Sequence, residues 1–294
     1  MHMKELFKGT CVALITPFKR GKIDYARLED MIEFQIFAGT SAILILGTTG
    51  ESPTVTYEER VSMMKFCKEK IDSRCLMLVG AGSNSTKTSI ELCRTAESYG
   101  ADGLLVVTPY YNKCNQEGLY EHYKAVAGSV KIPIIMYNVP SRTGVNIEPQ
   151  TAEKLSHIKN IVGIKEANSD KNHIDKMIKS LCGKIAVYSG NDDLNYYFLE
   201  RNASGIISVT ANLFPELAKE MVDEFYAGNK ESALTMHESL QGLNHAMFVD
   251  TNPIPVKYGA SYLHLCENEL RLPLTPLPVE KKGIVEKEID KLIY

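Results

Sequence analysis

The chain has 294 residues with a formal net charge of −3, and 44% of its residues are hydrophobic and 23% charged. These values are typical of a globular protein long enough for one large α/β domain or two smaller ones. The charge balance excludes the strongly basic class of protein that binds nucleic acid. No apolar run approaches the roughly 18 residues of a membrane span. Residues 1–8 are too short for a signal or transit peptide, so we expect a cytoplasmic protein with no membrane partner.

Seven cysteines, an odd number, are scattered without the close C-x-x-C spacing of metal ligands. Several of them, such as Cys11 and Cys75, stand in apolar surroundings, where a thiol behaves as a small hydrophobic side chain. We therefore expect reduced, structural cysteines and no metal site.

Short apolar stretches alternate with helical segments along the first two thirds of the chain. We expect strands at residues 11–18, 42–46, 76–79, 103–107, 132–136, 161–165, 185–188 and 206–209. Helices are expected at residues 24–37, from 56, at 86–99, from about 116, at 149–156 and 173–181, and in a segment that ends near 201. Asp24 is a typical helix cap, and Thr56 with Glu59 forms a capping box.

Eight strands, each followed by a helical segment, predict a parallel sheet closed into a (β/α)₈ TIM barrel. The competing open sheet of dinucleotide-binding proteins is disfavoured because no G-x-G-x-x-G follows the first strand. Beyond residue 213 the pattern is helical only, at 213–227, 230–247 and 255–266, with a charged amphipathic end from 279. We expect a catalytic barrel over residues 1–227 and a helical extension over 228–294 packed on it.

The sixth predicted strand contains an unusual residue. It reads Ile-Val-Gly-Ile over residues 161–164 and then ends on Lys165, whose ammonium is costly to bury. In one interpretation the strand stops at Ile164 and Lys165 reaches solvent. In the other, Lys165 is a desolvated amine that attacks a ketone and forms a Schiff base. The other residues of the chain are needed to distinguish these two interpretations.

Polar residues recur where the predicted strands end, which in a TIM barrel is the face that builds the active site. They are Thr48 and Thr49 after the second strand, Tyr110 and Tyr111 after the fourth, Tyr137 and Arg142 at the fifth, Lys165 at the sixth and Gly190 after the seventh. Each alone has an ordinary structural explanation. Because these residues converge on one face of the predicted barrel, a functional site there is favoured.

These residue types suit one chemistry. A lysine amine can condense with a 2-oxo acid to an iminium, which acidifies the adjacent carbon without a metal or cofactor. Backbone N–H groups in the glycine-flanked turn of Thr48 and Thr49, at a helix start, could bind the oxo acid's carboxylate. Tyr137 could carry protons with a threonine hydroxyl to relay them, and Arg142 could bind a second carboxylate.

Three motifs in the same order and spacing carry a family resemblance. They are Gly-Thr-Thr-Gly-Glu at 47–51, the segment from Tyr137 to Arg142, and Gly-Ile-Lys-Glu at 163–166. Together they resemble the N-acetylneuraminate lyase/dihydrodipicolinate synthase superfamily of Schiff-base aldolases. The resemblance runs over essentially the whole chain, including residues 108–111 and 252–257. Thr48-Thr49, where the lyases more often have Ser-Thr, and Arg142, which the lyases lack, make the chain most similar to the synthase branch.

The resemblance implies condensation of pyruvate with L-aspartate 4-semialdehyde, in lysine and diaminopimelate biosynthesis, through a Schiff base on Lys165. It implies Tyr137 as proton carrier and substrate-positioning group, with Thr49 and Tyr111 completing a hydroxyl relay. Tyr111 would come from the neighbouring subunit of a tight dimer, in a homotetramer built as a dimer of dimers. The residues that it implies at the substrates are Thr48 and Thr49, Arg142 for the semialdehyde carboxylate, and Gly190 and Ile207 at the pyruvate pocket.

One departure concerns feedback inhibition. Lysine-inhibited members of the superfamily carry histidines or other binding residues and a glutamate where this chain has Tyr57, Arg60 and Thr88, with Lys87 adjacent, although Asn84 and Tyr110 still match. A cationic ligand would meet Arg60 and Lys87 without a matching glutamate. We expect inhibition by lysine to be weak or absent.

Two alternatives stay open at this stage. Another pyruvate-dependent aldolase, such as a lyase of sialic acid or of a 2-keto-3-deoxy sugar acid, would keep Lys165 and Tyr137 and differ at the contacts of the second substrate, where Arg142 discriminates. A catalytically silent barrel, serving as a sensor or scaffold, would have lost the lysine, the tyrosine or the threonine turn. All three are present.

Overall fold

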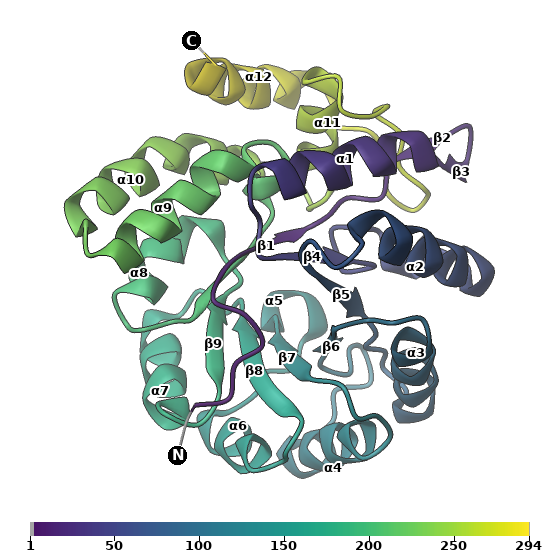
Figure 1. The fold of residues 1–294 in the computed structure, drawn as a ribbon, viewed down its shortest axis with the longest axis vertical. Coiled ribbons are helices and arrows are strands. Elements are labelled where there is room, and N and C mark those ends of the chain that lie inside the picture. Colours follow the sequence, from purple (N-terminus) through teal and green to yellow (C-terminus); the bar gives the residue numbers. More distant parts are fainter. Residues whose placement is uncertain (1–2, 294) are drawn as a thin grey trace. The chain divides into compact units, whose positions relative to one another are not determined.

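A computed structural model describes residues 3–293, and within this range eight parallel strands form one closed barrel (Figure 1). The strand order around the barrel is β1-β10-β9-β8-β7-β6-β5-β4. The strands are β1 (Gly9–Ala13), β4 (Ala42–Ile45), β5 (Leu76–Gly80), β6 (Gly103–Val107), β7 (Ile134–Asn138), β8 (Ile161–Glu166), β9 (Ala186–Ser189) and β10 (Gly205–Ser208). The predicted (β/α)₈ barrel is confirmed.

Helices follow the strands as the sequence predicts. They are α1 (Tyr25–Phe37), α2 (Tyr57–Ile71), α3 (Thr86–Ser98), α4 (Gln116–Ala127), α5 (Pro140–Thr143), α6 (Pro149–Ser156), α7 (Lys171–Leu181), α8 (Asn195–Leu199), α9 (Pro215–Ala227), α10 (Lys230–Ala246), α11 (Ile254–Tyr262) and α12 (Val279–Ile293), with short 3₁₀ turns at Ser52–Thr54, Asp192–Leu194 and Thr210–Asn212. Both predicted caps are present: Asp24 accepts the N–H of Arg27, and Thr56 with Glu59 makes the reciprocal capping box.

The first strand is shorter than predicted, and a hairpin follows it. β1 ends at Ala13; the N–H of Leu14 still donates to the Leu44 carbonyl of β4 at 2.9 Å, but the next N–H, that of Ile15, donates to the Asn212 side chain at 3.0 Å. The antiparallel pair β2 (Phe18–Lys19) and β3 (Lys22–Ile23) lies outside the barrel. The prediction of one strand over 11–18 was therefore wrong beyond residue 13. Pro17, which has no N–H to donate, stands between the two elements.

The chain divides into two compact units. One comprises Met1–Gly9 and Leu76–Ile207, and the other comprises Thr10–Cys75 and Ser208–Tyr294. The first contains β5 to β9, most of β10 and the helices α3 to α8; the second contains most of β1, β4, the helices α1 and α2, and α9 to α12. In the first unit, α6 and α7 cover the outer side of β8 and β9 (Figure 1). The division at residue 227, expected from the helical pattern, stays a prediction.

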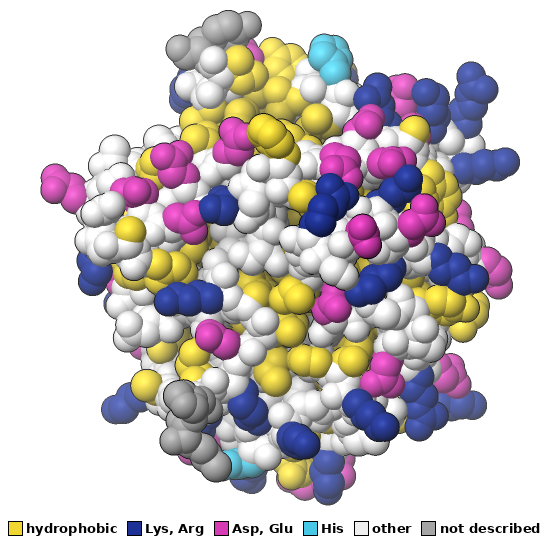
Figure 2. Space-filling model, viewed as in Figure 1, with side chains coloured by type: hydrophobic (Ala, Val, Ile, Leu, Met, Phe, Trp, Pro, Cys, Tyr) yellow, Lys and Arg dark blue, Asp and Glu magenta, His cyan; other side chains and the backbone are white. Residues whose placement is uncertain are grey.

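Charged side chains of both signs are interspersed on the surface seen in Figure 2. Some of them form ion pairs: Lys70 of α2 pairs with Glu29 of α1, and Arg74, in the loop after α2, pairs with Glu33 of α1. This mixture agrees with the small net charge. Across residues 3–293, no helix is both long enough and apolar enough to span a membrane.

Candidate active site

Lys165 lies inside the barrel wall. All six residues of β8 are buried, and Lys165 is 5% exposed. The strand continues through Lys165 to Glu166, whereas the interpretation of Lys165 as a surface residue requires the strand to stop at Ile164. An amine buried at the carboxyl end of a barrel strand has the setting that Schiff-base chemistry requires.

Tyr137 on β7 is the register partner of Lys165 on β8. The Nζ atom of Lys165 lies 4.8 Å from the centroid of the Tyr137 ring, and Tyr137 is 7% exposed. An irregularity in the ladder produces this alignment, because Ile134 pairs with Ile161 whereas Ile135 pairs with Gly163. Without the one-residue shift, Tyr137 would pair with Ile164. Bulges that re-aim a side chain in this way are common beside active sites.

Gly190 leaves room for the lysine side chain. A Cβ atom at this position would lie 3.0 Å from Lys165 Cε, 2.9 Å from the Glu166 carbonyl oxygen and 2.8 Å from Ala167 Cβ. The N–H of Gly190 donates to that same carbonyl at 2.8 Å, which holds the loop after β9 against the end of β8. Ile207, 1% exposed on β10, is a buried wall residue of the barrel. A larger residue at 190 would therefore force Ala167, the Glu166 backbone or the Lys165 side chain to shift.

The outer side of the same two strands carries a buried polar cluster. Asn138 and Glu166 form the next register pair after Tyr137 and Lys165, and neither side chain is exposed to solvent. The Asn138 Nδ2 donates to both carboxylate oxygens of Glu166 at 3.0 Å each. His173 on α7 places its Nε2 3.5 Å from Glu166 Oε2, and this carboxylate raises the pKa of His173 above its ordinary value near 6.5.

Arg142 and Tyr111 lie on adjacent loops near these strands. Arg142 stands in α5, a single turn that begins at Pro140 directly after β7 and ends at Gly144 in the left-handed region. Lys113, from the loop between β6 and α4, packs over Gly144, because a Cβ there would come 2.9 Å from Lys113 Cε. Tyr111 lies in the same loop with φ of 74° and is 88% exposed. The single chain therefore leaves the Tyr111 ring largely in solvent and does not bury it beside Lys165.

The turn that contains Thr48 and Thr49 follows β4. Thr49 is 3% exposed, and its Oγ1 accepts a hydrogen bond from Asn252 Nδ2 at 3.0 Å. The next α-helix, α2, begins at Tyr57 after the predicted Thr56 cap, and a 3₁₀ turn at Ser52–Thr54 separates it from the threonine turn, which therefore does not stand at a helix start as expected. Any anion-binding N–H groups here therefore belong to the turn itself and not to the end of α2. Asn252 fixes the orientation of the Thr49 hydroxyl.

A buried ion pair lies next to the threonine turn. Glu51, 2% exposed and in the left-handed region, pairs with Lys257, which has no exposed surface. Lys257 Nζ also donates to the Thr16 carbonyl at 2.8 Å and lies 4.3 Å from the centroid of the Phe18 ring. Burial lowers the pKa of Lys257, and the Glu51 carboxylate acts in the opposite direction. This second buried lysine is engaged by three groups.

Sequence reasoning assigned no role to Asn252, Lys257, Asn138 or His173. Asn252 and Lys257 lie in the segment 252–257, for which the sequence offers a family resemblance but no individual roles, and Asn138 stands directly after Tyr137 in the motif. The available signal was the pattern that identified Lys165: Lys257 is a lone cation among Ile254, Pro255 and Val256.

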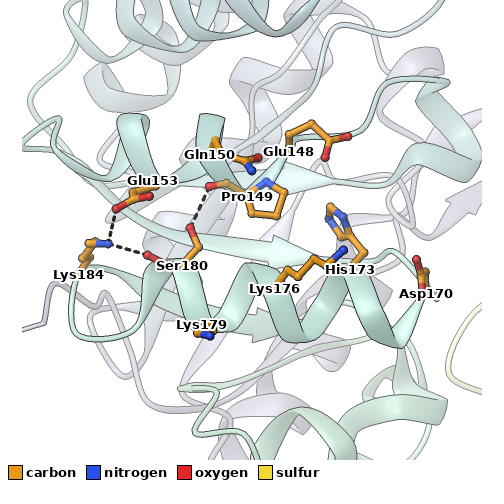
Figure 3. Close-up of a pocket in the computed structure, with 10 residues that line it drawn as sticks. All are labelled: Glu148, Pro149, Gln150, Glu153, Asp170, His173, Lys176, Lys179, Ser180 and Lys184. Carbon is orange, nitrogen blue, oxygen red and sulfur yellow. Dashed lines mark hydrogen bonds and ion pairs between the residues drawn. The ribbon is translucent and has the colours of Figure 1, made fainter.

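A surface groove lies away from this chemistry, on the outer side of the barrel between α6 and α7 (Figure 3). It has a volume of about 560 Å³, and its lining is mostly charged. Lys184, which follows α7, links the two helices by pairing with Glu153 of α6 at 2.8 Å and donating to the Ser180 carbonyl of α7 at 2.7 Å. His173 forms part of its wall. Among the residues that the structure describes, no group of three or more His, Cys, Asp or Glu side chains is arranged to hold a metal ion.

Comparison with known proteins identifies the family. The model of the dihydrodipicolinate synthetase family matches residues 6–292. The 4-hydroxy-tetrahydrodipicolinate synthases of Geotalea uraniireducens and Thermotoga neapolitana are 48% and 47% identical, covering 94% and 92% of this chain and 96% and 94% of theirs. A solved structure of the chloride-inhibited dihydrodipicolinate synthase from Acinetobacter baumannii, complexed with pyruvate, matches with a TM-score of 0.95 at 41% identity, over 97% of this chain and 98% of that one. The chain belongs to the dihydrodipicolinate synthetase family.

Proposed function

We propose that this chain acts as a 4-hydroxy-tetrahydrodipicolinate synthase and condenses pyruvate with L-aspartate 4-semialdehyde in lysine and diaminopimelate biosynthesis. The observation that carries the proposal is the buried amine of Lys165 directly opposite Tyr137. The relatives at 47% and 48% identity that bear this name support the choice of reaction, as does the pyruvate complex of the Acinetobacter baumannii enzyme.

The reaction begins at Lys165. Its neutral amine attacks the keto carbon of pyruvate, and loss of water from the carbinolamine gives an imine. The cationic imine accepts electrons when a proton leaves the methyl carbon, and the resulting enamine forms a carbon–carbon bond with the aldehyde of the second substrate. Displacement of Lys165 by the amino group of that substrate releases the cyclic product. The covalent imine serves in place of a separate cofactor.

Tyr137 is the proposed proton carrier for carbinolamine formation and dehydration. Thr49 continues the relay, because the amide N–H of Asn252 donates to its Oγ1 and leaves the threonine's own proton to be donated elsewhere. The turn of Thr48 and Thr49 binds the pyruvate carboxylate. Gly190 and Ile207 bound the space beside Lys165, and Arg142 binds the carboxylate of the semialdehyde through its planar guanidinium.

Tyr111 is proposed to act in the partner subunit. Its side chain is 88% exposed and its backbone is held in the left-handed region, which is uncommon for a tyrosine. A ring held outward in this way is suited to enter the site of a second copy. We propose a homotetramer, a dimer of dimers, with Tyr111 shared across the tight dimer, in the cytoplasm.

A steady-state assay tests the reaction class against its nearest alternative. We expect turnover of pyruvate with L-aspartate 4-semialdehyde and no cleavage of N-acetylneuraminate or of 2-keto-3-deoxy sugar acids. Cleavage of a sugar acid without turnover of the semialdehyde would assign the chain to a lyase. Absence of turnover with every substrate, together with absence of a pyruvate imine, would favour a silent barrel.

A further inference from the structure

The end of β8 carries one ionisable side chain on each side of the barrel wall. Side chains alternate along a strand, so Lys165 points inward beside Tyr137, and Glu166 points outward to the helices. Glu166 is completely buried. A carboxylate at this depth is stable only when hydrogen bonds or a counter-charge replace its lost hydration.

Asn138 supplies the first of these hydrogen bonds, and its own orientation is determined by its neighbours. Its Oδ1 accepts the N–H of Ile147 at 2.9 Å, so its Nδ2 is the atom that faces Glu166. The same Nδ2 lies 2.9 Å from Asn146 Oδ1. Because a backbone N–H can only donate, the amide cannot be reversed without losing this bond. The N–H of Asn168 adds a further bond to Glu166 Oε1 at 2.8 Å.

His173 supplies the counter-charge when it is protonated. Its ring is 8% exposed, in the wall of the groove between α6 and α7, and faces Glu166 with Nε2 and the Asn146 amide with Nδ1 (Figure 3). The other acidic groups that act on it are Glu148, which precedes α6, and Asp170, which caps α7. Lys176, from its own helix, lines the same groove. His173 thus connects the buried carboxylate to the surface of the protein.

We infer that Asn138, Glu166 and His173 are positioning residues for the reacting pair. Asn138 and Glu166 are register partners one residue beyond Tyr137 and Lys165, so the amide–carboxylate bridge ties β7 to β8 immediately behind the chemistry. His173, when protonated, pairs with the same carboxylate from α7. The bridge fixes the directions in which Lys165 and Tyr137 leave their strands. This inference rests on the proposed function, since it takes Lys165 as the nucleophile.

The direct test is Glu166→Gln, which keeps the shape of the side chain and removes its charge. The amide nitrogen that replaces one carboxylate oxygen would face the Asn138 Nδ2, donor against donor. We expect the variant to fold and the rate of pyruvate imine formation, followed by borohydride quenching and mass spectrometry, to fall by about tenfold or more, because small misplacements of reacting groups are costly. We expect kcat to fall by a similar factor and KM for pyruvate to change less.

Asn160→Ala is the matched control. Asn160 precedes the opposite end of β8, and its Nδ2 donates to the carbonyls of Ala127 and Val130 at 3.0 and 3.1 Å. Its loss should lower the melting temperature and leave the imine rate unchanged. If Glu166→Gln lowers stability to the same extent and forms the imine at the wild-type rate, the cluster is only structural and the inference is wrong.

His173→Gln provides a second test, at the groove wall on the other side of Glu166 from Asn138. We expect a smaller loss of imine rate, together with loss of the inflection that His173 titration contributes to the pH profile of that rate in the wild type. An unchanged rate and an unchanged profile would overturn the inference, even if Glu166→Gln failed to fold. If the wild-type protein forms no imine at all, the proposed function fails instead, so the two failures are distinguishable.

Discussion

Tyr137 and Lys165 face each other across β7 and β8, with the lysine Nζ 4.8 Å from the centroid of the tyrosine ring. The pair exists because a one-residue irregularity in the ladder brings an inward-facing lysine opposite an inward-facing tyrosine. An amine and a phenol in this arrangement can exchange protons through a bound substrate, and a general acid–base group contributes about 10²–10⁴-fold in rate. The following predictions start from this arrangement.

Tyr137→Phe removes the phenolic hydroxyl and keeps the ring. We expect the rate of imine formation and kcat to fall by about 10²-fold or more, with little change in melting temperature. Tyr258→Phe is the control, because Tyr258 is a partly buried tyrosine on α11 whose hydroxyl donates to the Glu286 carboxylate on α12. That variant should lose stability and keep its rate. Equal rates for the two variants would remove Tyr137 from the proton path.

Arg142→Ala separates the two substrates. The variant should form the pyruvate imine at the wild-type rate, because Arg142 stands in the exposed turn α5 and not in β8. Turnover with L-aspartate 4-semialdehyde should fall by about 10²-fold or more, since a guanidinium–carboxylate pair is lost. Arg94→Ala, on the outer helix α3, serves as a control for the loss of a surface arginine. Wild-type turnover of L-aspartate 4-semialdehyde by Arg142→Ala would contradict the role of Arg142 and favour the lyase alternative.

Lys257→Met tests the buried pair that supports the threonine turn. It should lower the free energy of unfolding by about 3–5 kcal/mol, because Glu51 would remain buried without its counter-charge. Adding Glu51→Gln to this variant should recover a large part of the loss, and urea unfolding measures all three proteins. A loss well below 1 kcal/mol in the single variant would show that water replaces the ammonium. We expect Lys257→Met to change the stability of the protein and to leave Lys165 as the nucleophile.

His173 should make stability depend on pH. Glu166 raises the pKa of His173 in the folded state above its ordinary value near 6.5. The folded state therefore binds the proton more tightly, and the stabilisation is fully present below that value and is lost as the pH rises through the raised folded pKa. The stability difference between wild type and His173→Gln should shrink as the pH increases over this window. A difference that is constant with pH would contradict the ion pair.

Feedback inhibition by L-lysine should be weak or absent. Where inhibited relatives carry histidines or other binding residues and a glutamate, this chain has Tyr57, Arg60 and Thr88, and the Arg60 guanidinium donates to the Ser52 carbonyl at 2.6 Å. Added cationic groups disfavour a cationic ligand. Titration of L-lysine into the steady-state assay measures this directly. Strong inhibition at sub-millimolar concentration would show that other residues bind it.

The strands were predictable because a buried parallel strand needs an apolar run, and eight such runs stand in the sequence. Their ends were less so. Whether β8 stops at Ile164 or continues through Glu166 depends on the partners that satisfy Glu166, and these come from β7 and α7. The hairpin at Phe18–Ile23 was missed because its apolar start reads as part of the preceding strand.

The site was predictable where chemistry and position coincide, as for Lys165 at a strand end. It was not predictable where the partner is remote in sequence: Lys257 and Glu51 are separated by 206 positions, and Asn252 and Thr49 by 203. No periodicity in the sequence joins such pairs. Tyr111 is a third kind of case, since its role depends on a second copy of the chain.

The most direct measurement is intact-mass spectrometry after incubation with pyruvate and borohydride, followed by peptide mapping, beside a Lys165→Ala control. We predict one pyruvate-sized adduct on Lys165, absent from the control, and none on Lys257, whose ammonium is held by Glu51, the Thr16 carbonyl and the Phe18 ring. Absence of an adduct on the folded protein, or an adduct that persists in Lys165→Ala, would contradict the assignment of Lys165 as the Schiff-base lysine.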